Sequence, residues 1–265
     1  MHTILHPLFA RIRKYESMTI LEIKNISKSF GGVKAVHDVS FALEREKITA
    51  LIGPNGAGKT TLFNIVNGFL SGDEGSIIFE EQDVTHRPAY ERSRLGMSRT
   101  FQLSRVFKNL TIGENLMLAA RMDDNLFWRS MVRPEPESVF HERIQKAIVF
   151  VGLDKPLNTP VTDLSYGQQK LFDLARAIVN PHTMLLLDEP VAGVNPVIRE
   201  KLKSLMQDLR TRKESVLLIE HDMDFVRGVA DRVIVMAEGE VIADGLPEEV
   251  LRHSRVLEAY LGVTT

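Results

Sequence analysis

The sequence predicts an α/β fold with a mostly parallel sheet, an antiparallel β-subdomain ahead of it and an inserted α-helical subdomain. Three observations predict this fold. A glycine-rich segment at residues 53–60 stands between an apolar strand pattern and a helix pattern. Short apolar strands recur after residue 184 with helical segments between them, as in parallel sheets covered on both faces. The segment from about residue 103 to residue 180 is helical and interrupts that alternation.

The composition limits the classes of protein to which this chain can belong. Its 265 residues, 44% of them hydrophobic, suffice for the core of one α/β domain with a subsidiary lobe. The net charge of −2 gives no sign of a nucleic-acid partner. The absence of cysteine excludes disulfides and thiolate metal sites and fits a reducing compartment. No apolar stretch approaches the roughly 18 residues that span a bilayer, so we expect a cytosolic protein.

Residues 1–17 precede the first strand pattern and allow two interpretations. Their apolar residues share one helical face beside basic residues, which is typical of a membrane-surface or partner-binding helix. Pro7 interrupts that face and chain termini are usually loose, which favours a frayed extension, or an upstream start with Met18 as the true beginning. We expect residues 1–18 to be a poorly ordered extension of a domain that spans residues 19–265.

Strand patterns come first along the domain. From Ile20 to Ser40 short apolar and polar groups alternate around a turn at Gly31-Gly32, which predicts antiparallel strands. Gly75–Phe79 predicts another strand, and the apolar run Ile48–Ile52 suits a buried parallel strand. After residue 60, apolar residues at helical spacing predict a helix; they are Leu62, Ile65, Val66 and Phe69.

The segment from Gly53 to Thr60, GPNGAGKT, matches the pattern of a phosphate-binding loop in the strand–loop–helix context that the motif requires. Its glycines let the backbone approach an anion, so that N–H groups and the positive end of the helix meet a phosphate. Lys59 can bridge the β- and γ-phosphates of ATP, and the Thr60 hydroxyl can ligate the accompanying Mg²⁺. The predicted nucleotide contacts are Gly53, Asn55, Gly56, Gly58, Lys59, Thr60 and Thr61.

The helical segment contains two clear helix patterns. Thr111–Glu114 is a capping box ahead of the first, and the second carries an apolar stripe that stops at Gly152. Trp128 and two nearby prolines mark an irregular connection in this lobe. The stripe consists of Phe140, Ile144, Ala147, Ile148 and Val151.

Two acidic residues end the first strand after the helical segment. The apolar run Met184–Leu187 is followed by Asp188 and Glu189, and open parallel sheets bind ligands at the carboxyl ends of their strands. Asp188 can hold Mg²⁺ through water, and Glu189 is the candidate base for the attacking water. A solvated turn is the alternative, which the phosphate loop disfavours. Later strands are predicted at residues 216–219, 233–236 and, after a turn at Glu238-Gly239, 241–243.

A second helix start has the features of an anion site. Ser165 and Gln168 form a capping box ahead of a helix that ends before Pro181, and Gly167 permits close approach. A plain N-cap is the alternative. Because this helix leads into the strand bearing Asp188 while the phosphate loop lies elsewhere, we expect it to contact a γ-phosphate in trans.

Five motifs in this order resemble those of ATP-binding cassette (ABC) ATPases, which are phosphate-loop (P-loop) NTPases. They are the phosphate loop, Arg99-Thr100-Phe101-Gln102, Leu164-Ser165-Tyr166-Gly167-Gln168, Leu187-Asp188-Glu189-Pro190 and Ile219-Glu220-His221-Asp222-Met223. The resemblance runs from about Thr19 to the end of the chain. With Ala192–Pro196 and Ala259–Gly262 the chain looks like the ATP-binding subunits of branched-chain amino acid importers (LivG type); lipopolysaccharide-export and urea-import ATPases share several of these strings.

The resemblance implies roles for three further residues. Phe30 matches the aromatic residue that stacks on adenine, where Tyr is commoner; a core residue of an edge strand is the alternative. Gln102 matches the switch glutamine that touches Mg²⁺ or the attacking water and links the core to the helical lobe. His221 matches the switch histidine that contacts the γ-phosphate.

The same resemblance assigns Ser165, Gly167 and Gln168 to the ATP of the opposite protomer. Tyr166 stands where the commoner motif has glycine, and Asn195 where the loop usually has aspartate. Neither change removes a phosphate ligand, but both bear on the coupling between the two sites.

The function that the resemblance implies is ATP hydrolysis coupled to transport. We expect a homodimer, or a heterodimer with a related ATPase subunit, that sandwiches two ATP molecules, closes on binding and opens on hydrolysis. Transmembrane permease subunits would hold it at the cytoplasmic face of the membrane, with a periplasmic or extracellular substrate-binding protein acting indirectly. Apolar residues beside Gln102 would either receive a permease helix or pack the helical lobe; they are Leu103, Val106, Phe107 and Leu110.

Branched-chain (hydrophobic) amino acids are the substrate implied by likeness alone, because specificity in this architecture belongs to the membrane subunits and the binding protein. Urea or amide import and lipopolysaccharide export are the alternatives. Two other classes are a soluble ABC ATPase that acts on DNA or ribosomes and a nucleotide-gated module that does not hydrolyse ATP. The chain lacks the second cassette or coiled-coil insertion usual in the first class, and Glu189, Gln102 and His221 argue against the second.

Overall fold

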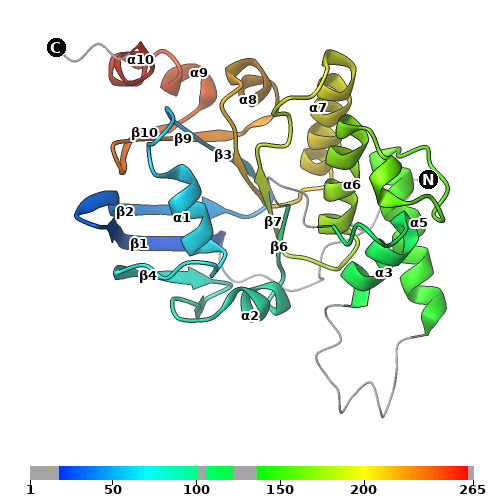
Figure 1. Ribbon diagram of the computed structural model, residues 1–265. Helices are drawn as coiled ribbons and strands as arrows, with labels where there is room; N and C mark the ends of the chain where they lie inside the picture. Colours follow the sequence, from blue (N-terminus) through cyan, green and yellow to red (C-terminus); the bar gives the residue numbers. More distant parts are fainter. Residues whose placement is uncertain (1–17, 101–105, 122–135, 262–265) are drawn as a thin grey trace, which may run out of the picture.

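A computed structural model describes residues 18–100, 106–121 and 136–261 of the chain. It contains a four-stranded sheet, a six-stranded sheet and a helical lobe, with the four-stranded sheet and the helical lobe at opposite ends of the molecule (Figure 1). The predicted extension at residues 1–17 lies outside the described residues.

The four-stranded sheet is antiparallel and has the strand order β2-β1-β4-β5. Gly31 and Gly32, both at positive φ, form the predicted turn between its two long strands. The antiparallel subdomain expected from the sequence is therefore confirmed. Its strands are β1 (Thr19–Phe30), β2 (Val33–Glu44), β4 (Glu74–Phe79) and β5 (Gln82–Asp83).

The six-stranded sheet has the order β10-β9-β3-β8-β7-β6, and all neighbouring pairs are parallel except β10 and β9. The mostly parallel core is thus confirmed. Its strands are β3 (Ile48–Ile52), β6 (Met97–Arg99), β7 (Met184–Asp188), β8 (Val216–Ile219), β9 (Arg232–Ala237) and β10 (Glu240–Gly245).

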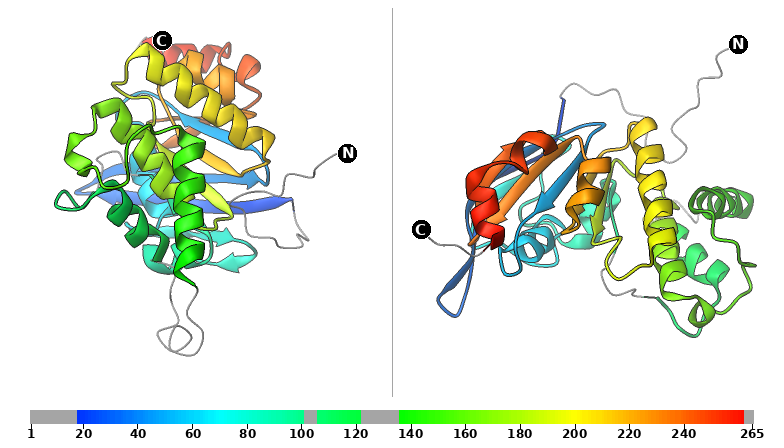
Figure 2. Two further views of the ribbon diagram at one scale, coloured as in Figure 1. Left: turned by 90° about the vertical axis from the view of Figure 1, so that its right-hand side faces the viewer. Right: turned by 90° about the horizontal axis from the view of Figure 1, so that it is seen from above.

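Successive side chains of a strand point to opposite sides of a sheet. Apolar side chains on both sides of this sheet are buried, and helices cover both faces. Leu186 and Leu217 join a buried cluster with α1 (Lys59–Val66) and the antiparallel sheet. Leu185, Leu187 and Leu218 join a second cluster on the other face, and the ribbon views show helices on that side of the sheet as well (Figure 2). The helices of that second face are α6 (Tyr166–Ile178), α7 (Pro196–Thr211), α8 (Met223–Val229), α9 (Pro247–Val250) and α10 (Ser254–Leu261).

The helical lobe consists of α3 (Ile112–Arg121), α5 (Glu137–Val151) and the 3₁₀ turn η1 (Val161–Asp163), together with α6, whose buried residues pack against them. Thr111 and Glu114 form the predicted capping box, and Gly152 ends α5 at a φ of +59°. The lobe shares one buried cluster with β7 and β8, so it does not have a core of its own. The predicted connection around Trp128 lies outside the described residues.

Two features of the core differ from the sequence analysis. Phe69 was expected on the helix after the phosphate loop, but α1 ends at Val66 and Phe69 is 48% exposed, because Gly68 turns the chain at a φ of +74°. The short helix α2 (Ala89–Arg94) and strand β6 were not predicted.

Among the described helices, none has the length and apolar character that a membrane crossing requires.

The Arg92 guanidinium holds the end of α1. It is 2% exposed and donates four hydrogen bonds to main-chain carbonyl oxygens at 2.6–3.0 Å. Two of these oxygens belong to Ile65 and Val66 at the end of α1, where helix carbonyls lack helical partners. Burial lowers the pKa of Arg92 to about 10, so the side chain stays charged at neutral pH.

We predict that Arg92→Met lowers the free energy of unfolding by about 3 kcal/mol, because it leaves buried carbonyl groups without donors. Urea unfolding followed by circular dichroism measures this loss. Arg94→Met, at an exposed position of the same helix, is the control and should change stability by less than about 0.5 kcal/mol. Equal effects of the two substitutions would contradict this role of Arg92.

Candidate functional site

Three loops leave the six-stranded sheet at the carboxyl ends of neighbouring strands, which together form one edge of the sheet across its strands. Strands β3, β8 and β7 are parallel neighbours, and Leu51, Ile219 and Asp188 lie level in their register. The loops that follow them, residues 53–58, 220–222 and 189–195, therefore begin side by side. This edge brings together the predicted phosphate loop, acidic pair and histidine.

The phosphate loop needs glycine where it passes other strands. A Cβ atom on Gly53 would lie 2.0 Å from the Met236 carbonyl oxygen, and one on Gly58 would lie 2.1 Å from that of Ala35. Gly58 also has a φ of +92°, a conformation that L side chains rarely adopt. The loop can therefore follow this path only with these glycines.

Lys59 is the buried cation of the loop. It is 7% exposed, and its Nζ atom donates to the carbonyl oxygens of Gly53 at 2.7 Å and Pro54 at 2.8 Å. Burial lowers the pKa of Lys59, and the nearby Glu189 carboxylate opposes that effect. The predicted lysine and the predicted base thus lie within electrostatic range of one another. The rest of the α1 start is more open, with Asn55, Gly56 and Thr60 exposed and Thr61 half-buried.

Asp188 lies at the end of β7 and is 3% exposed. Its Oδ2 atom accepts a hydrogen bond from Arg99 Nη2 at 3.0 Å, and its main-chain N–H donates to the hydroxyl of Thr100 at 3.1 Å. Burial raises the pKa of the Asp188 carboxyl, and Arg99 opposes this shift. The contact with β6 was not predicted; its only sequence signal is the position of Arg99 within the motif that also contains Gln102.

Glu189 follows in a left-handed conformation with a φ of +47°. Its main-chain N–H donates to the Ile219 carbonyl oxygen at 3.0 Å, which joins the starts of two loops. The side chain is half-buried at the sheet edge.

Glu220 is a buried carboxylate that the sequence analysis did not single out. It has no exposed surface, and its two oxygens accept the main-chain N–H groups of Val191 at 2.9 Å and His221 at 3.0 Å. Burial raises the pKa of Glu220, whereas these hydrogen bonds lower it. Glu220 therefore ties the loop after β7 to the loop after β8, while the His221 side chain, 57% exposed, points to solvent.

Asp222 joins the same loop to α7. Its carboxylate accepts from Arg199 Nε at 2.7 Å and Nη2 at 2.8 Å, and it also caps α8 through the Phe225 N–H. The bidentate pair lowers the pKa of Asp222 to about 2. Asn195 caps α7 through the N–H of Ile198 at 3.0 Å, a role that the usual aspartate would also fill.

The second predicted anion site lies on α6. Ser165 caps this helix in a reciprocal box with Gln168, as predicted. A Cβ atom on Gly167 would lie 2.7 Å from the Ile198 side chain, so glycine is needed where α6 meets α7. The buried residues of α6 pack on the sheet face opposite the one that α1 covers.

Phe30 and Gln102 have different outcomes. Phe30 ends β1 and is 49% exposed, which argues against a buried core role and leaves its ring available for contact. Gln102 and Leu103 lie outside the described residues. Of the apolar residues beside them, Val106 packs against the helical lobe, whereas Phe107 is exposed and Leu110 is half-buried.

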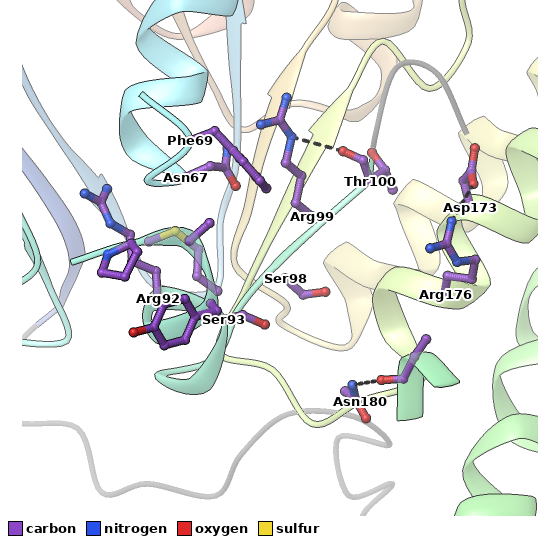
Figure 3. Close-up of a pocket in the computed structure, with 15 residues that line it drawn as sticks. Asn67, Phe69, Arg92, Ser93, Ser98, Arg99, Thr100, Asp173, Arg176 and Asn180 are labelled. Carbon is purple, nitrogen blue, oxygen red and sulfur yellow. Dashed lines mark hydrogen bonds and ion pairs between the residues drawn. The ribbon is translucent and has the colours of Figure 1, made fainter. Parts of the chain in front are cut away.

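A cleft of about 510 Å³ separates α2 and β6 from α3 and α6 (Figure 3). Aromatic and cationic side chains line it together with polar groups of β6. The lining residues include Phe69, Tyr90, Arg99, Thr100 and Arg176. Because Arg99 and Thr100 also contact Asp188, the wall of the cleft continues directly into the site.

The donor chemistry of the site fits Mg²⁺. Thr60 and Asp188 offer oxygen atoms, and the described part of the chain has no cluster of three or more His, Asp or Glu side chains that could hold a metal alone. Mg²⁺ at nucleotide sites typically uses one or two protein oxygens, water and the substrate phosphates.

The fold and the loop define the class of protein: a nucleotide-binding α/β protein with a phosphate loop after the central strand. The family model described as ABC transporter matches residues 36–192, and that of the branched-chain amino acid ATP-binding cassette transporter matches residues 240–264.

Relatives extend over nearly the whole chain. A probable branched-chain amino acid transport ATP-binding protein LivG of Archaeoglobus fulgidus is 40% identical, over 92% of this chain and 96% of its own length. The high-affinity LivG protein of Escherichia coli K12 is 36% identical, over 93% and 99%. The crystal structure of the ADP conformation of an ABC transporter cassette superposes with a TM-score of 0.82 at 34% identity, over 93% of this chain and all of that one.

The chain therefore belongs to the ABC transporter family of ATP-binding cassette ATPases. The resemblance stated from its motifs is confirmed, and the two relatives named above, matched over 96% and 99% of their length, are LivG proteins.

We predict that Asp222→Asn, which keeps a good N-cap but removes the charge, lowers the free energy of unfolding by about 1 kcal/mol at neutral pH. The folded pKa of about 2 lies below the ordinary value of 3.8, so the carboxylate stabilises the fold above pH 4 and loses this effect as the pH falls toward 2. Urea unfolding of both proteins at pH 7 and pH 3 measures the difference. A difference that is larger at pH 3 would contradict the ion-pair account.

Proposed function

We propose that this protein is the ATP-hydrolysing subunit of an importer of branched-chain amino acids. The observation that carries the proposal is the convergence of the phosphate loop, Asp188, Glu189 and His221 at one strand edge in a member of the ABC family. The match of residues 240–264 to the branched-chain transporter model and the names of the full-length relatives support the substrate class.

In this proposal ATP lies along the start of α1. Lys59 exchanges its two loop carbonyls for the β- and γ-phosphates, and the backbone from Gly53 to Thr61 supplies N–H donors. The half-exposed ring of Phe30 stacks on adenine. Asn55, Gly56, Gly58 and Thr60 complete the contacts.

Glu189 acts as the base that takes a proton from the attacking water, and His221 contacts the γ-phosphate. The two residues follow adjacent strands, and the buried Glu220 carboxylate fixes the distance between their loops. Thr60, Asp188 and Gln102 would hold Mg²⁺, which when bound offsets negative charge on the phosphates. The Arg99 guanidinium beside Asp188 opposes the rise in its pKa that burial causes.

The predicted anion site at the start of α6, which is the second half of a nucleotide site (the α6 half-site), requires a partner subunit. The starts of α1 and α6 lie on opposite faces of one sheet, so a nucleotide at the phosphate loop does not meet Ser165, Gly167 and Gln168 of the same chain. We infer a head-to-tail dimer, with itself or with a related ATPase subunit, in which each ATP contacts α1 of one protomer and α6 of the other.

The cleft between the lobes suits a cytoplasmic helix of a permease. Phe69 and Tyr90 are exposed aromatic side chains, and Arg99 on the same wall contacts Asp188. A helix seated there would link membrane subunits to the Mg²⁺ ligand and would hold the protein at the cytoplasmic face of the membrane. A substrate-binding protein on the other side would act indirectly, through the permease. Co-purification of this chain with a permease and a branched-chain amino acid binding protein tests the transport assignment; a urea-binding or lipopolysaccharide-binding partner would overturn it.

We predict that Glu189→Gln binds ATP normally but lowers the rate of hydrolysis at least 100-fold, because the neutral amide cannot accept the proton. With ATP and Mg²⁺ the variant should elute from a sizing column as a long-lived dimer. Glu142→Gln, at an exposed position of α5, is the control and should hydrolyse ATP normally. A monomeric and fully active Glu189→Gln protein would refute the assignment of the base.

A further inference from the structure

The loop after β7 is held by side chains from another element. The carbonyl oxygen of Glu189 accepts the N–H of Ala192 at 3.2 Å and the ammonium of Lys170 at 2.9 Å. The carbonyl oxygen of Ala192 accepts the hydroxyl of Tyr166 at 3.0 Å. The two side-chain donors, Lys170 and Tyr166, belong to α6. Because Glu189 has a φ of +47°, which is uncommon for a residue with a side chain, its conformation depends on such external bonds.

Tyr166 and Lys170 act from one face of α6. They are four residues apart, one helical turn, and the Lys170 ammonium lies 5.8 Å from the centre of the Tyr166 ring. Gly193 lets the loop pass close to this ring, because a Cβ atom there would lie 3.3 Å from it. Lys170 is 8% exposed, so its bond to Glu189 is protected from water. The two side chains, together the α6 bracket, connect α6 to the loop by two hydrogen bonds.

The glycine form of the motif could not make the bond from position 166. Glycine has no donor beyond its main chain, whereas the Tyr166 hydroxyl reaches across to Ala192. Tyr166 in place of the usual glycine therefore adds a hydrogen bond to Ala192 and removes none of the predicted phosphate contacts. It joins the capped start of α6 at Ser165 to the loop that begins with Glu189.

We propose that Tyr166 and Lys170 are positioning residues that couple the α6 half-site to Glu189 of the same chain. The inference rests on the proposed function, in which α6 contacts the ATP bound by the partner subunit. A small shift of α6 on contact with that ATP moves the carbonyl groups of Glu189 and Ala192 with it. Each chain thus senses the partner's nucleotide through α6 and adjusts the base of its own site.

The test compares Tyr166→Phe and Lys170→Met in the full-length chain. Tyr166→Phe removes one oxygen and keeps the ring against Gly193, and Lys170→Met keeps the length of the side chain without its charge. We expect kcat to fall about 5-fold and about 10-fold, which corresponds to one neutral and one charged hydrogen bond. The dissociation constant for ATP should stay within about two-fold, and the Hill coefficient for ATP should fall toward 1.

Lys201→Met is the matched control. Lys201 also donates to a main-chain carbonyl, that of Gly152 at 2.5 Å, but this bond joins α7 to the end of α5 and not to the loop after β7. It should leave kcat and the Hill coefficient unchanged. A merely structural effect of the α6 bracket would lower thermal stability without changing the Hill coefficient.

A second measurement separates positioning from nucleotide contact. In the Glu189→Gln background, Tyr166→Phe should still form the ATP-dependent dimer, because Ser165 and Gly167 are intact. Loss of that dimer would overturn the proposal by making Tyr166 a direct ligand or interface residue, and unchanged kcat and Hill coefficient in both variants would overturn it as well. If Glu189→Gln alone forms no dimer with ATP, the proposed function itself fails, which is a distinct result.

Discussion

Two helices, α1 and α6, begin on opposite faces of the same six-stranded sheet, and the other features of the site depend on this separation. Each helix start has unpaired N–H groups and the positive end of a helix dipole, so each suits an anion. In the proposed function, one bound nucleotide contacts α1 of one chain and α6 of its partner. In the proposed mechanism this geometry makes pairing a requirement for catalysis, and hydrolysis can therefore control whether two subunits stay together.

Buried charged side chains hold in place the loops that follow β3, β7 and β8. Asp188, Glu220 and Lys59 are all almost fully buried, and burial works against the charged form of each. Hydrogen bonds compensate: a guanidinium for Asp188, main-chain N–H groups for Glu220 and two carbonyl oxygens for Lys59. Such groups are a costly way to stabilise a fold, but they fix loop positions with the precision that proton transfer from a single water to a base requires.

The sequence predicted those parts of the site that depend on local order along the chain. The phosphate loop, the two capping boxes and the acidic pair each lie within a few residues, and their neighbours predicted the element types correctly. Strand β6 is three residues long and exists because it pairs with β7, more than 80 residues later, so no local pattern marks it. Arg92 and Glu220 are charged residues that sequence alone would leave in solvent; only the fold brings main-chain groups to them. The bond from Tyr166 to Ala192 likewise depends on the packing of α6 against the loop.

The most direct test of the two half-sites is complementation between two inactive variants. Lys59→Ala removes the cation of the phosphate loop, and Ser165→Arg blocks the start of α6, so each protein alone should hydrolyse almost no ATP. When the two are mixed, a head-to-tail dimer pairs the intact loop of one with the intact helix start of the other. The account predicts that ATPase activity of the mixture rises well above the sum of the separate proteins. A mixture no more active than that sum would contradict the head-to-tail pairing of this chain with itself.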